Sequence, residues 1–353
     1  MSLNEQRILI VKQSSLGDII HTLPVVHALK RCFPKSYIGW VVEKGYADLL
    51  CCDDTIDTVH AIHIPSTSSP DSTLWSYWKA LTATVKILHD LRSTFGANPY
   101  NLVLDLHASF RSGMLSIINP GGTRYGFRNA REFNTFFQHH LIDIPPEITH
   151  AVEKNLLFAS TFHCSVLPSD FRLCSSPTDE QAAIRFLEEA HIDSTGRFVY
   201  VNTTARWQSK FWLAERWGEL CDRLISVGIW PILGGSSSDL SYIQQVVQHM
   251  KNSPIIAAGK LSLTESVALL KRSTAYVGLD TGPMHIAAMA GIPVVALFGP
   301  THPERVGPYG VRQKILRADD VSCLCCRKRI CSRMDCMRGI SVEQVYTGVL
   351  DLV

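Results

Sequence analysis

Apolar runs that alternate with helical segments constrain the fold of this chain more than any other feature of its sequence. The run RILIVK at residues 7–12 has an unbroken apolar centre, which is typical of a strand buried on both faces of a parallel sheet. In the first half, the pattern predicts strands at 7–12, 37–42, 59–64 and 101–106, helices at 24–32 and 74–91, and a loop rich in Ser, Thr and Pro at 65–73.

The second half repeats this alternation after a polar, proline-containing stretch at 175–179. The pattern there predicts helices at 179–190, 214–226, 239–249, 263–271 and 283–290, and strands at 198–202, 229–233, 254–257, 275–278 and 293–298. Strands that alternate with helices in this way predict an α/β fold with a doubly wound sheet in each half.

The length of 353 residues suits two domains of about 150 residues each. We expect one domain at 1–172 and a second at 173–353, as two facing Rossmann-like domains with a cleft between them. Ligands of open α/β sheets bind beyond the carboxyl ends of the strands. The loops that follow the predicted strands are therefore the places to look for functional residues.

The composition excludes several classes of protein. Apolar residues make up 46% of the chain and charged residues 19%, which are globular values. A net charge of +2 does not favour a general nucleic-acid binder. No apolar run reaches the roughly 18–20 residues of a membrane helix, and the first apolar run is too short for a signal peptide. We therefore expect a cytoplasmic protein.

The loop after the first strand reads QSSLGD over residues 13–18. Gly17 permits a tight turn and the close approach of a ligand, although neither GxGxxG nor a Walker motif is present. Asp18 could accept a proton from an attacking hydroxyl as a general base. The alternative is that Asp18 only caps the following helix. His21 is either a second polar residue of the cleft or a packed histidine.

Hydroxyl and basic side chains follow the strand at 198–202, in the segment TTARWQSKFW. Thr203, Thr204 and Lys210 suit phosphate binding, because the start of a helix favours an anion and a lysine supplies a point charge. The alternative for Lys210 is a solvated lysine on an exposed turn.

The segment GLDTGPMH at 278–285 follows another strand. Thr281 and Gly282 at the start of a helix form a potential diphosphate cradle, with Pro283 at the first helical position. Asp280 could accept hydrogen bonds from sugar hydroxyls, and His285 falls in the same helical turn. The alternative is that Asp280 or Thr281 serves only as the helix cap.

Together these motifs resemble family 9 glycosyltransferases, the lipopolysaccharide heptosyltransferases. The resemblance spans nearly the whole chain and rests on ILIVKQSSLGDIIHTLPVVHAL, WVVEKGYADLL, LVLDLHASFRSG, AREFN, NTTARWQSKFW, GLDTGPMHIAAMAGIPVVALFGPTHPERVGPYG and the terminal cysteine pattern. It implies the GT-B fold, an ADP-heptose donor and inversion at the anomeric carbon. The implied acceptor is a Kdo sugar of the inner core on lipid A.

By position, the resemblance makes Asp18 the catalytic base. It assigns the donor diphosphate to Thr203, Thr204, Lys210, Thr281 and Gly282, and the donor sugar to Asp280 and His285. Many glycosyltransferases hold a divalent cation on the donor diphosphate with an Asp-x-Asp pair, and this sequence contains none. We therefore expect no cofactor and a metal-independent reaction.

An anionic acceptor calls for polar and basic side chains in the first domain. Ser15, Gly17 and His21 are candidates near the base. Arginines in segments that follow strands are candidates for Kdo carboxylates or lipid phosphates through paired hydrogen bonds, and these are Arg111, Arg124, Arg128 and Arg131. Ordinary surface arginines are the alternative. The implied location is the inner face of the inner membrane, as a peripheral protein.

Five of the eleven cysteines crowd into residues 323–336. Cys323, Cys326, Cys331 and Cys336 read C-x₂-C-x₄-C-x₄-C, with Cys325 in addition. Four such thiolates could hold zinc, although the spacing is not a standard pair of CxxC knuckles. Structural thiols or disulfides formed on purification are the alternatives. The surrounding basic residues could face anionic lipid or form a solvated loop.

Three other functions remain open. One is a family 9 transferase with a different nucleotide-sugar or acceptor. Another is a sugar-nucleotide epimerase with a similar fold, which would act on the donor alone. The third is a binding protein without catalysis, against which the combination of a base, a phosphate lysine and a donor turn argues. A donor panel and an assay without acceptor distinguish these possibilities.

Overall fold

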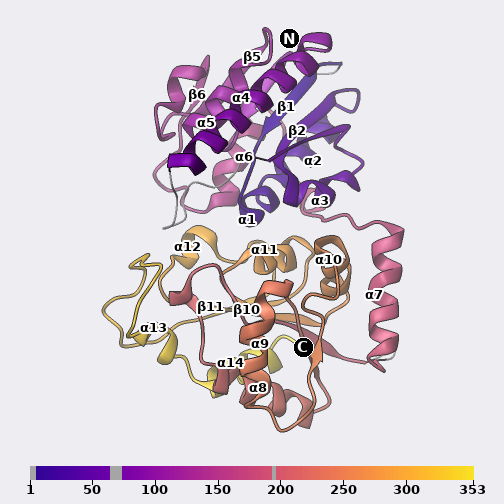
Figure 1. The fold of residues 1–353 in the computed structure, drawn as a ribbon, viewed down its shortest axis with the longest axis vertical. Helices are drawn as coiled ribbons and strands as arrows, with labels where there is room; N and C mark the ends of the chain where they lie inside the picture. The colour runs from indigo at the N-terminus through magenta and orange to yellow at the C-terminus, as the bar shows by residue number, and fades with distance from the viewer. Residues whose placement is uncertain (1–4, 64–73, 193–195) are drawn as a thin grey trace. The chain divides into compact units, whose positions relative to one another are not determined.

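The computed structural model describes residues 5–63, 74–192 and 196–353, and the chain forms two compact units (Figure 1). Unit 1 comprises Met1–Cys174 and unit 2 comprises Ser175–Val353. The sequence placed this division after residue 172. Each unit has its own six-stranded parallel sheet, so the predicted α/β fold is confirmed.

The sheet of unit 1 has the strand order β3-β2-β1-β4-β5-β6. Its strands are β1 (Arg7–Val11), β2 (Tyr37–Glu43), β3 (Thr58–Ile62), β4 (Leu102–Asp105), β5 (Thr123–Phe127) and β6 (His140–Ile142). Its helices are α1 (Leu16–Ile20), α2 (Leu23–Cys32), α3 (Ala47–Cys51), α4 (Leu74–Ala97), α5 (Phe110–Ile117) and α6 (Ala151–Thr161), and a 3₁₀ turn, η2, spans Asn134–Phe137.

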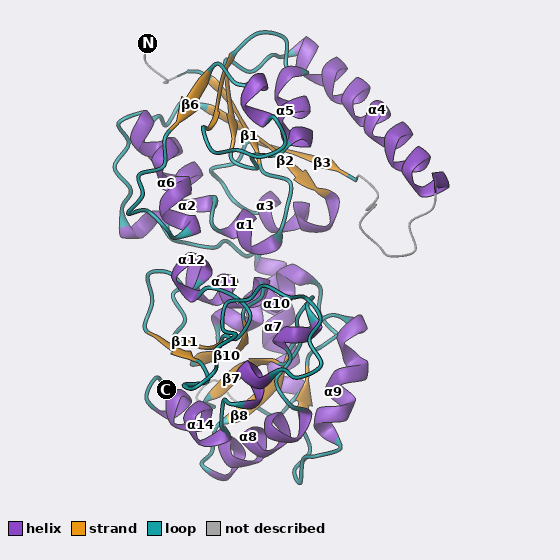
Figure 2. Ribbon diagram, turned by 90° about the vertical axis from the view of Figure 1, so that its left-hand side faces the viewer, coloured by secondary structure: helices purple, strands orange, loops and turns teal. Residues whose placement is uncertain are grey.

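Helices α4 and α5 cover one face of this sheet (Figure 2). Leu9 and Val11 of β1 point into that layer, where they meet Phe95 of α4 and Leu115 of α5. All four side chains are buried. The other apolar residues of β1, Ile8 and Ile10, are also fully buried, which explains the unbroken apolar run of the first strand.

Unit 2 has the strand order β12-β11-β10-β7-β8-β9. Its strands are β7 (Phe198–Asn202), β8 (Trp230–Leu233), β9 (Ile255–Ile256), β10 (Ala275–Leu279), β11 (Val294–Leu297) and β12 (Gln313–Leu316). Its helices are α7 (Pro177–Glu189), α8 (Ala214–Ser226), α9 (Leu240–Val247), α10 (Leu263–Lys271), α11 (Gly282–Met289), α12 (Pro303–Val306), α13 (Asp335–Arg338) and α14 (Val342–Leu350), and a 3₁₀ turn, η4, spans Gln208–Lys210.

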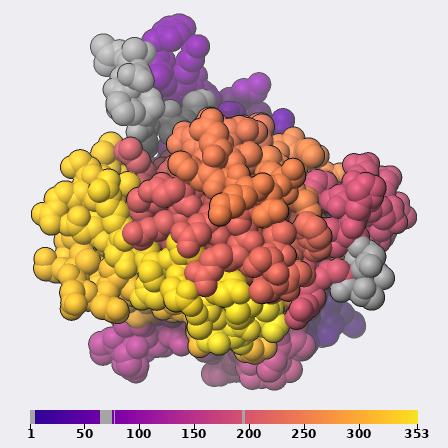
Figure 3. Space-filling model, turned by 90° about the horizontal axis from the view of Figure 1, so that it is seen from below, coloured from indigo at the N-terminus to yellow at the C-terminus, as the bar shows by residue number. Residues whose placement is uncertain are grey.

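The C-terminal residues complete the core of unit 2. Val345 and Val349 of α14 are fully buried in the same cluster as Trp217 and Leu220 of α8. Arg216 of α8 also donates a hydrogen bond to the carbonyl of Arg338 at 2.6 Å. The space-filling view shows the C-terminal residues, in yellow, against the red and orange surface of the same unit (Figure 3).

Several element boundaries differ from the predicted ones. The helix predicted at 179–190 begins at Pro177, because Ser176 caps it: the Ser176 hydroxyl accepts from the Asp179 amide at 3.1 Å. The polar stretch at 175–179 therefore contains the start of this helix. Helix α4 continues to Ala97, beyond the predicted end at 91.

The apolar pattern did not predict ten of the described elements, which are α1, α3, α5, β5, β6 and α6 in unit 1 and α12, β12, α13 and α14 in unit 2. These elements are short or lack a clear period. The strand predicted at 59–64 ends at Ile62, and the predicted loop at 65–73 lies outside the described residues. Among the described residues, none of the helices combines the length and apolar character needed to cross a bilayer.

Candidate active site

The two sheets share one topology, and each contains one point at which the strand order reverses. In unit 1 the reversal lies between β1 and β4, where Val11 pairs with Asp105. In unit 2 it lies between β7 and β10, where Asn202 pairs with Gly278. Ligands of doubly wound sheets bind beyond the carboxyl ends of the strands at such a point. Most of the sequence-predicted site residues fall in the four loops that leave these strands or in the first turn of the helix that follows each loop.

Asp18 lies in the third position of α1, and Ser15 is the residue that caps this helix. One carboxylate oxygen, Oδ2, accepts hydrogen bonds from the Ser15 amide at 2.9 Å and from its hydroxyl at 2.8 Å. This is a capping box, so the capping alternative for Asp18 is observed. The side chain is still 47% exposed, and Oδ1 lies 3.8 Å from Lys12 Nζ. Capping uses one oxygen and leaves the other directed toward a cation.

The surroundings of Asp18 favour its charged form. Burial acts to raise the pKa of this carboxyl, but the Lys12 charge and the two Ser15 hydrogen bonds lower it to about 2. Asp18 is therefore a carboxylate at neutral pH, the form that a general base requires. Lys12 is itself held in place, because its ammonium donates to the carbonyl of Leu106 at 2.8 Å.

His107 follows β4 and belongs to the same group of charges, although the sequence reasoning did not select it. Burial lowers the pKa of His107 to about 4, with the charges of Lys12 and Arg111 adding to this and the charge of Asp18 opposing it. Its Nδ1 is buried and has no hydrogen-bond partner among the described residues. The available signal was its position directly after a predicted strand.

Asp105, at the end of β4, is a second functional candidate that the sequence reasoning missed. Its buried carboxylate accepts from the amides of His107 and Ala108 at 3.0 and 3.1 Å. It also accepts from Ser112 Oγ at 2.9 Å and from Asn134 Nδ2 at 2.7 Å. One carboxylate thus holds the loop after β4, the start of α5 and the turn η2 together. Burial raises its pKa, with these hydrogen bonds opposing the shift.

The four arginines proposed for the acceptor have different surroundings. Arg124 lies inside β5 rather than after a strand, and it donates to the Phe137 carbonyl at 2.6 Å and contacts His139. Arg128 is paired with Asp143. The side chains of Arg111 and Arg131 have no polar partner within the described part of the chain, and the Arg131 amide donates to Ala108 at 3.2 Å. Arg111 and Arg131 are therefore the two available cations near His107.

The remaining first-unit candidates are largely structural in this conformation. Gly17 and His21 are buried, and the His21 ring lies 5.8 Å from the His150 ring. Asn155 donates to the His21 carbonyl at 3.1 Å. Ser15 is occupied by its hydrogen bonds to Asp18.

In unit 2, Lys210 and Asp280 form an ion pair across the reversal point. Lys210 Nζ donates to Asp280 Oδ2 at 2.6 Å and to the Asp280 carbonyl at 2.7 Å. The side chains are 14% and 6% exposed. Lys210 is therefore not the solvated lysine of the alternative interpretation, and the carboxylate of Asp280 pairs with a cation instead of capping α11.

Thr281 caps α11 through its backbone only, because its hydroxyl donates to Asn202 Oδ1 at 2.8 Å. This contact ties the loop after β10 to the end of β7. Gly282 is the first residue of α11, so Pro283 takes the second position and not the predicted first. The amides of this first turn have no intrahelical acceptor, which makes them suitable for an anion.

Thr203 and Thr204 are both buried, and Thr203 Oγ1 has no hydrogen-bond partner among the residues that the structure describes. A buried hydroxyl without a partner is costly in a folded protein. It is therefore a candidate contact for a ligand at the end of β7. His285 is also buried, and its Nε2 lies 4.0 Å from Asp280 Oδ1.

The cysteine-rich segment packs against the same edge of unit 2. The Lys328 carbonyl accepts from Ser209 Oγ at 2.6 Å, and the Arg329 guanidinium lies 5.5 Å from the centre of the Trp207 ring. Lys210 Nζ lies 5.0 Å from the same ring. This segment therefore brings a second cation to the tryptophan ring that Lys210 also contacts, and the sequence reasoning did not connect the two.

The cysteines do not form a metal site in this conformation. Of the described residues, no three of the sulfurs of Cys323, Cys326, Cys331 and Cys336 lie within 4.8 Å of one another. No disulfide joins cysteines in the described part of the chain. Cys336 is buried, whereas Cys323 and Cys326 are exposed, so the four thiols have different environments.

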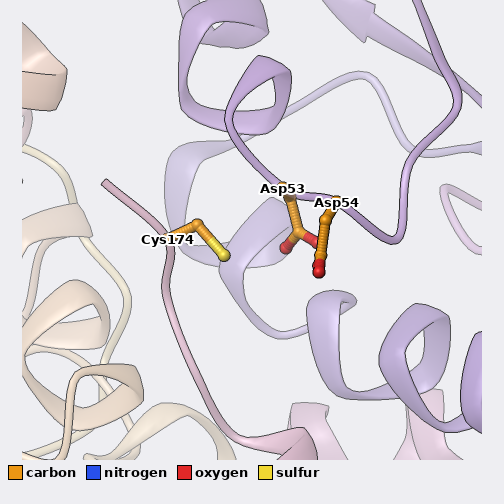
Figure 4. A group of neighbouring side chains, drawn as sticks. All are labelled: Asp53, Asp54 and Cys174. Carbon is orange, nitrogen blue, oxygen red and sulfur yellow. The ribbon is translucent and has the colours of Figure 1, made fainter. Parts of the chain in front are cut away.

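A different group has metal-ligand spacing, namely Asp53, Asp54 and Cys174 (Figure 4). Protein groups already satisfy its charges. Asp53 Oδ2 lies 2.7 Å from His27 Nε2, and Asp53 Oδ1 accepts from the Thr55 hydroxyl at 2.6 Å. Asp54 accepts from Arg172 at 3.2 Å. The contact between Arg172 and Asp54 holds the C-terminal end of unit 1 against the rest of that unit. We assign no ion to the group.

Comparisons with known proteins identify the family and the fold of this chain. The family model of glycosyltransferase family 9 (heptosyltransferase) matches residues 88–337. Lipopolysaccharide heptosyltransferase 1 of Pseudomonas aeruginosa is 28% identical over 344 residues, which are 92% of this chain and 87% of that protein.

Two solved structures resemble the chain over almost its entire length. A family 9 glycosyl transferase from Veillonella parvula has a TM-score of 0.84 at 22% identity and covers 100% of this chain and 98% of its own. The E. coli heptosyltransferase WaaC with ADP-2-deoxy-2-fluoro heptose has a TM-score of 0.73 at 23% identity and covers 98% of this chain and 100% of its own. Because the family model matches most of the chain, the protein belongs to glycosyltransferase family 9 and is a glycosyltransferase.

Proposed function

We propose that the chain transfers heptose from ADP-heptose to a Kdo sugar of the lipopolysaccharide inner core, with inversion at the anomeric carbon. The observation that carries this proposal is the similarity to a lipopolysaccharide heptosyltransferase over 92% of the chain. The motif KxSSxGDxxHTLP, followed by WVVE, favours heptosyltransferase I within the family. The relative from P. aeruginosa, which is called heptosyltransferase 1, supports the same choice.

The donor belongs to unit 2 in this proposal. The diphosphate takes the first-turn amides of α11 and the hydroxyls of Thr203 and Thr204, and it draws on the charges of Lys210 and Arg329. The buried Thr203 hydroxyl gains the partner that it lacks among the described residues. Asp280 holds Lys210 in place and, with His285, contacts the sugar. These contacts stabilise the negative charge that develops on the departing ADP.

The base belongs to unit 1. The acceptor hydroxyl gives its proton to Asp18 while its oxygen attacks the anomeric carbon of the donor. The bond between that carbon and the diphosphate oxygen breaks, and ADP leaves with the bonding electrons. Attack from the face opposite the leaving group inverts the anomeric carbon. Lys12 and Ser15 keep Asp18 ionised, which supports its role as the proton acceptor.

A metal-independent reaction follows from the same residues. The sequence has no Asp-x-Asp pair, and Lys210 together with the start of α11 offers positive charge at the proposed diphosphate site. Turnover should therefore survive an excess of EDTA. A loss of activity that Mg²⁺ or Mn²⁺ restores would contradict this part of the proposal.

The acceptor site uses the free cations of unit 1. Arg111 and Arg131 are available for Kdo carboxylates or lipid phosphates, whereas Arg124 and Arg128 already have protein partners. A lipid-linked acceptor would place the enzyme, as a peripheral protein, on the inner face of the inner membrane. Sedimentation with anionic vesicles tests this location.

The decisive experiment is mass spectrometry of the products formed from ADP-heptose and Kdo–lipid A. We expect an acceptor heavier by one heptose and a stoichiometric release of ADP. A panel of other nucleotide-sugars, and a reaction without acceptor, identify a different family 9 transferase or an epimerase. Transfer only from another donor, or conversion of the donor alone, would reject the proposed function.

A further inference from the structure

A pocket of about 230 Å³ lies between α4 and α5 in unit 1. Leu81, Val85 and Leu88 of α4 form one wall, and Phe110 and Met114 of α5 belong to the other. Its only charged lining residue is Arg111, and Thr84 is the only other polar one. The pocket therefore offers almost no hydrogen-bonding groups to a ligand.

The pocket opens on an apolar surface that the described residues leave uncovered. Leu81, Val85 and Phe110 are all exposed, although they line the pocket. The exposed side chains of Trp78 and Trp75 continue the same stripe along α4 at helical spacing. Figure 2 shows this end of α4 at the outer edge of the unit. Contiguous exposed apolar surface of this kind marks a site of interaction.

The charged end of the pocket adjoins the candidate base. Arg111 is the second residue of α5, and α5 begins directly after the loop that contains His107. Lys12 lies 3.8 Å from Asp18 and donates to the carbonyl of Leu106, the residue directly before His107, so the loop that leads into α5 lies beside the candidate base. The Arg111 side chain has no protein partner among the described residues, and it is available to an anion at the pocket mouth.

We propose that this pocket binds an acyl chain of the glycolipid acceptor, with Arg111 pairing with an anionic group near the root of that chain. The inference rests on the proposed function for the identity of the acceptor. An acyl chain needs no hydrogen bonds, which matches the lining, whereas a peptide segment would leave its backbone groups without partners. Each methylene that the pocket buries strengthens binding about fourfold.

The kinetic test compares two acceptors, Kdo–lipid A and its fully deacylated form. Val85→Asp puts a charge into the pocket wall at an exposed helical position, and Leu81→Ser is a milder second variant. Val227→Asp is the matched control, because Val227 is a valine of similar exposure in unit 2, 43% against 58% for Val85. Binding of ADP-heptose by each variant reports on folding.

We expect Val85→Asp to raise the KM for the acylated acceptor by about tenfold or more, a loss equal to two or more buried methylenes. The deacylated acceptor should show an unchanged KM, and Val227→Asp should match the wild type with both. An equal change with both acceptors, or no change with either, would overturn the proposal. The proposal would also be overturned if the wild type were a dimer and Val85→Asp dissociated this dimer without changing the preference between the two acceptors. A second copy of the chain would then occupy the surface.

A binding test separates this inference from the proposed function. Decyl phosphate, below its micelle concentration, carries one chain and one anionic group and can be titrated calorimetrically. We expect saturable binding that Val85→Asp weakens about tenfold and Val227→Asp does not. If decyl phosphate binds in this way but no heptose is transferred, the proposed function fails and the lipid site stands. If heptose is transferred but decyl phosphate does not bind, the lipid site fails.

Discussion

The two reversal points use charge in opposite ways, although their sheets have the same topology. In unit 1, Asp18 is about half-exposed, and the charge of Lys12 together with two hydrogen bonds from Ser15 keeps it ionised. In unit 2, Lys210 and Asp280 are almost entirely buried, and each satisfies the other. The proposed roles fit this difference: a base must meet an incoming hydroxyl and therefore needs an exposed position, whereas a cation attracts a diphosphate more strongly where water is excluded.

This comparison predicts the largest effect for the base itself. Asp18→Asn should lower kcat by about 10²–10⁴-fold, because the amide cannot take the proton of the acceptor hydroxyl. The amide oxygen can still accept from Ser15, so the fold and the binding of ADP-heptose should survive. Asp48→Asn is the control, since Asp48 is an exposed acid in the first turn of α3. Near-normal turnover of Asp18→Asn would remove Asp18 from the mechanism.

Breaking the buried Lys210–Asp280 pair of unit 2 should lower the free energy of unfolding. Lys210→Met leaves the Asp280 carboxylate buried without its cation, at a cost of about 3–5 kcal/mol. Adding Asp280→Asn should restore most of the stability but not the affinity for ADP-heptose. Denaturant unfolding and donor titration measure the two quantities. Lys271→Met, which breaks the more exposed pair with Glu180, should cost less than about 1 kcal/mol.

Unit 1 also contains a buried carboxylate, that of Asp105. Its replacement tests whether burial alone explains the difference between Asp18 and the Lys210–Asp280 pair. Asp105→Asn presents amide hydrogens to Ser112 and Asn134, which both donate to the carboxylate in the native protein. The expected loss is about 2–3 kcal/mol, and it should be confined to unit 1. Hydrogen exchange resolved by unit checks this. Asp143→Asn, at an exposed pair with Arg128, should leave exchange unchanged.

The smallest effect concerns the ionisation of the base. Ser15→Ala removes one hydrogen bond to charged Asp18, so its pKa should rise from about 2 by about one unit. In the proposed mechanism the carboxylate is the active form, so the acid limb of kcat/KM should move to higher pH. Any stability that Asp18 contributes is present above the unfolded-state pKa of about 3.9 and is lost as the pH falls toward 2. An unshifted acid limb would mean that Ser15 does not control Asp18.

The elements from α7 to β11 in unit 2 were predicted more accurately than those of unit 1. β7, α8 and α10 have the predicted bounds, because β7 is an unbroken apolar run, α8 is strongly amphipathic and Ser262 caps α10. The region between β4 and α7 was left without elements. Its structure depends on the buried Asp105 carboxylate, whose partners lie up to 33 residues away in sequence. Spacing within a short window cannot predict such contacts.

The sequence by itself determined the α/β class, the two-unit organisation and the loops that contain the candidate residues, because apolar periodicity and strand ends are local properties. The tertiary structure decided which charged side chains contact one another. Only the pairing of β7 with β10 brings Lys210 to Asp280, and only the pairing of β1 with β4 brings His107 into reach of the charge of Asp18. The energies of buried charges depend on such neighbours in space, which the order of residues does not specify.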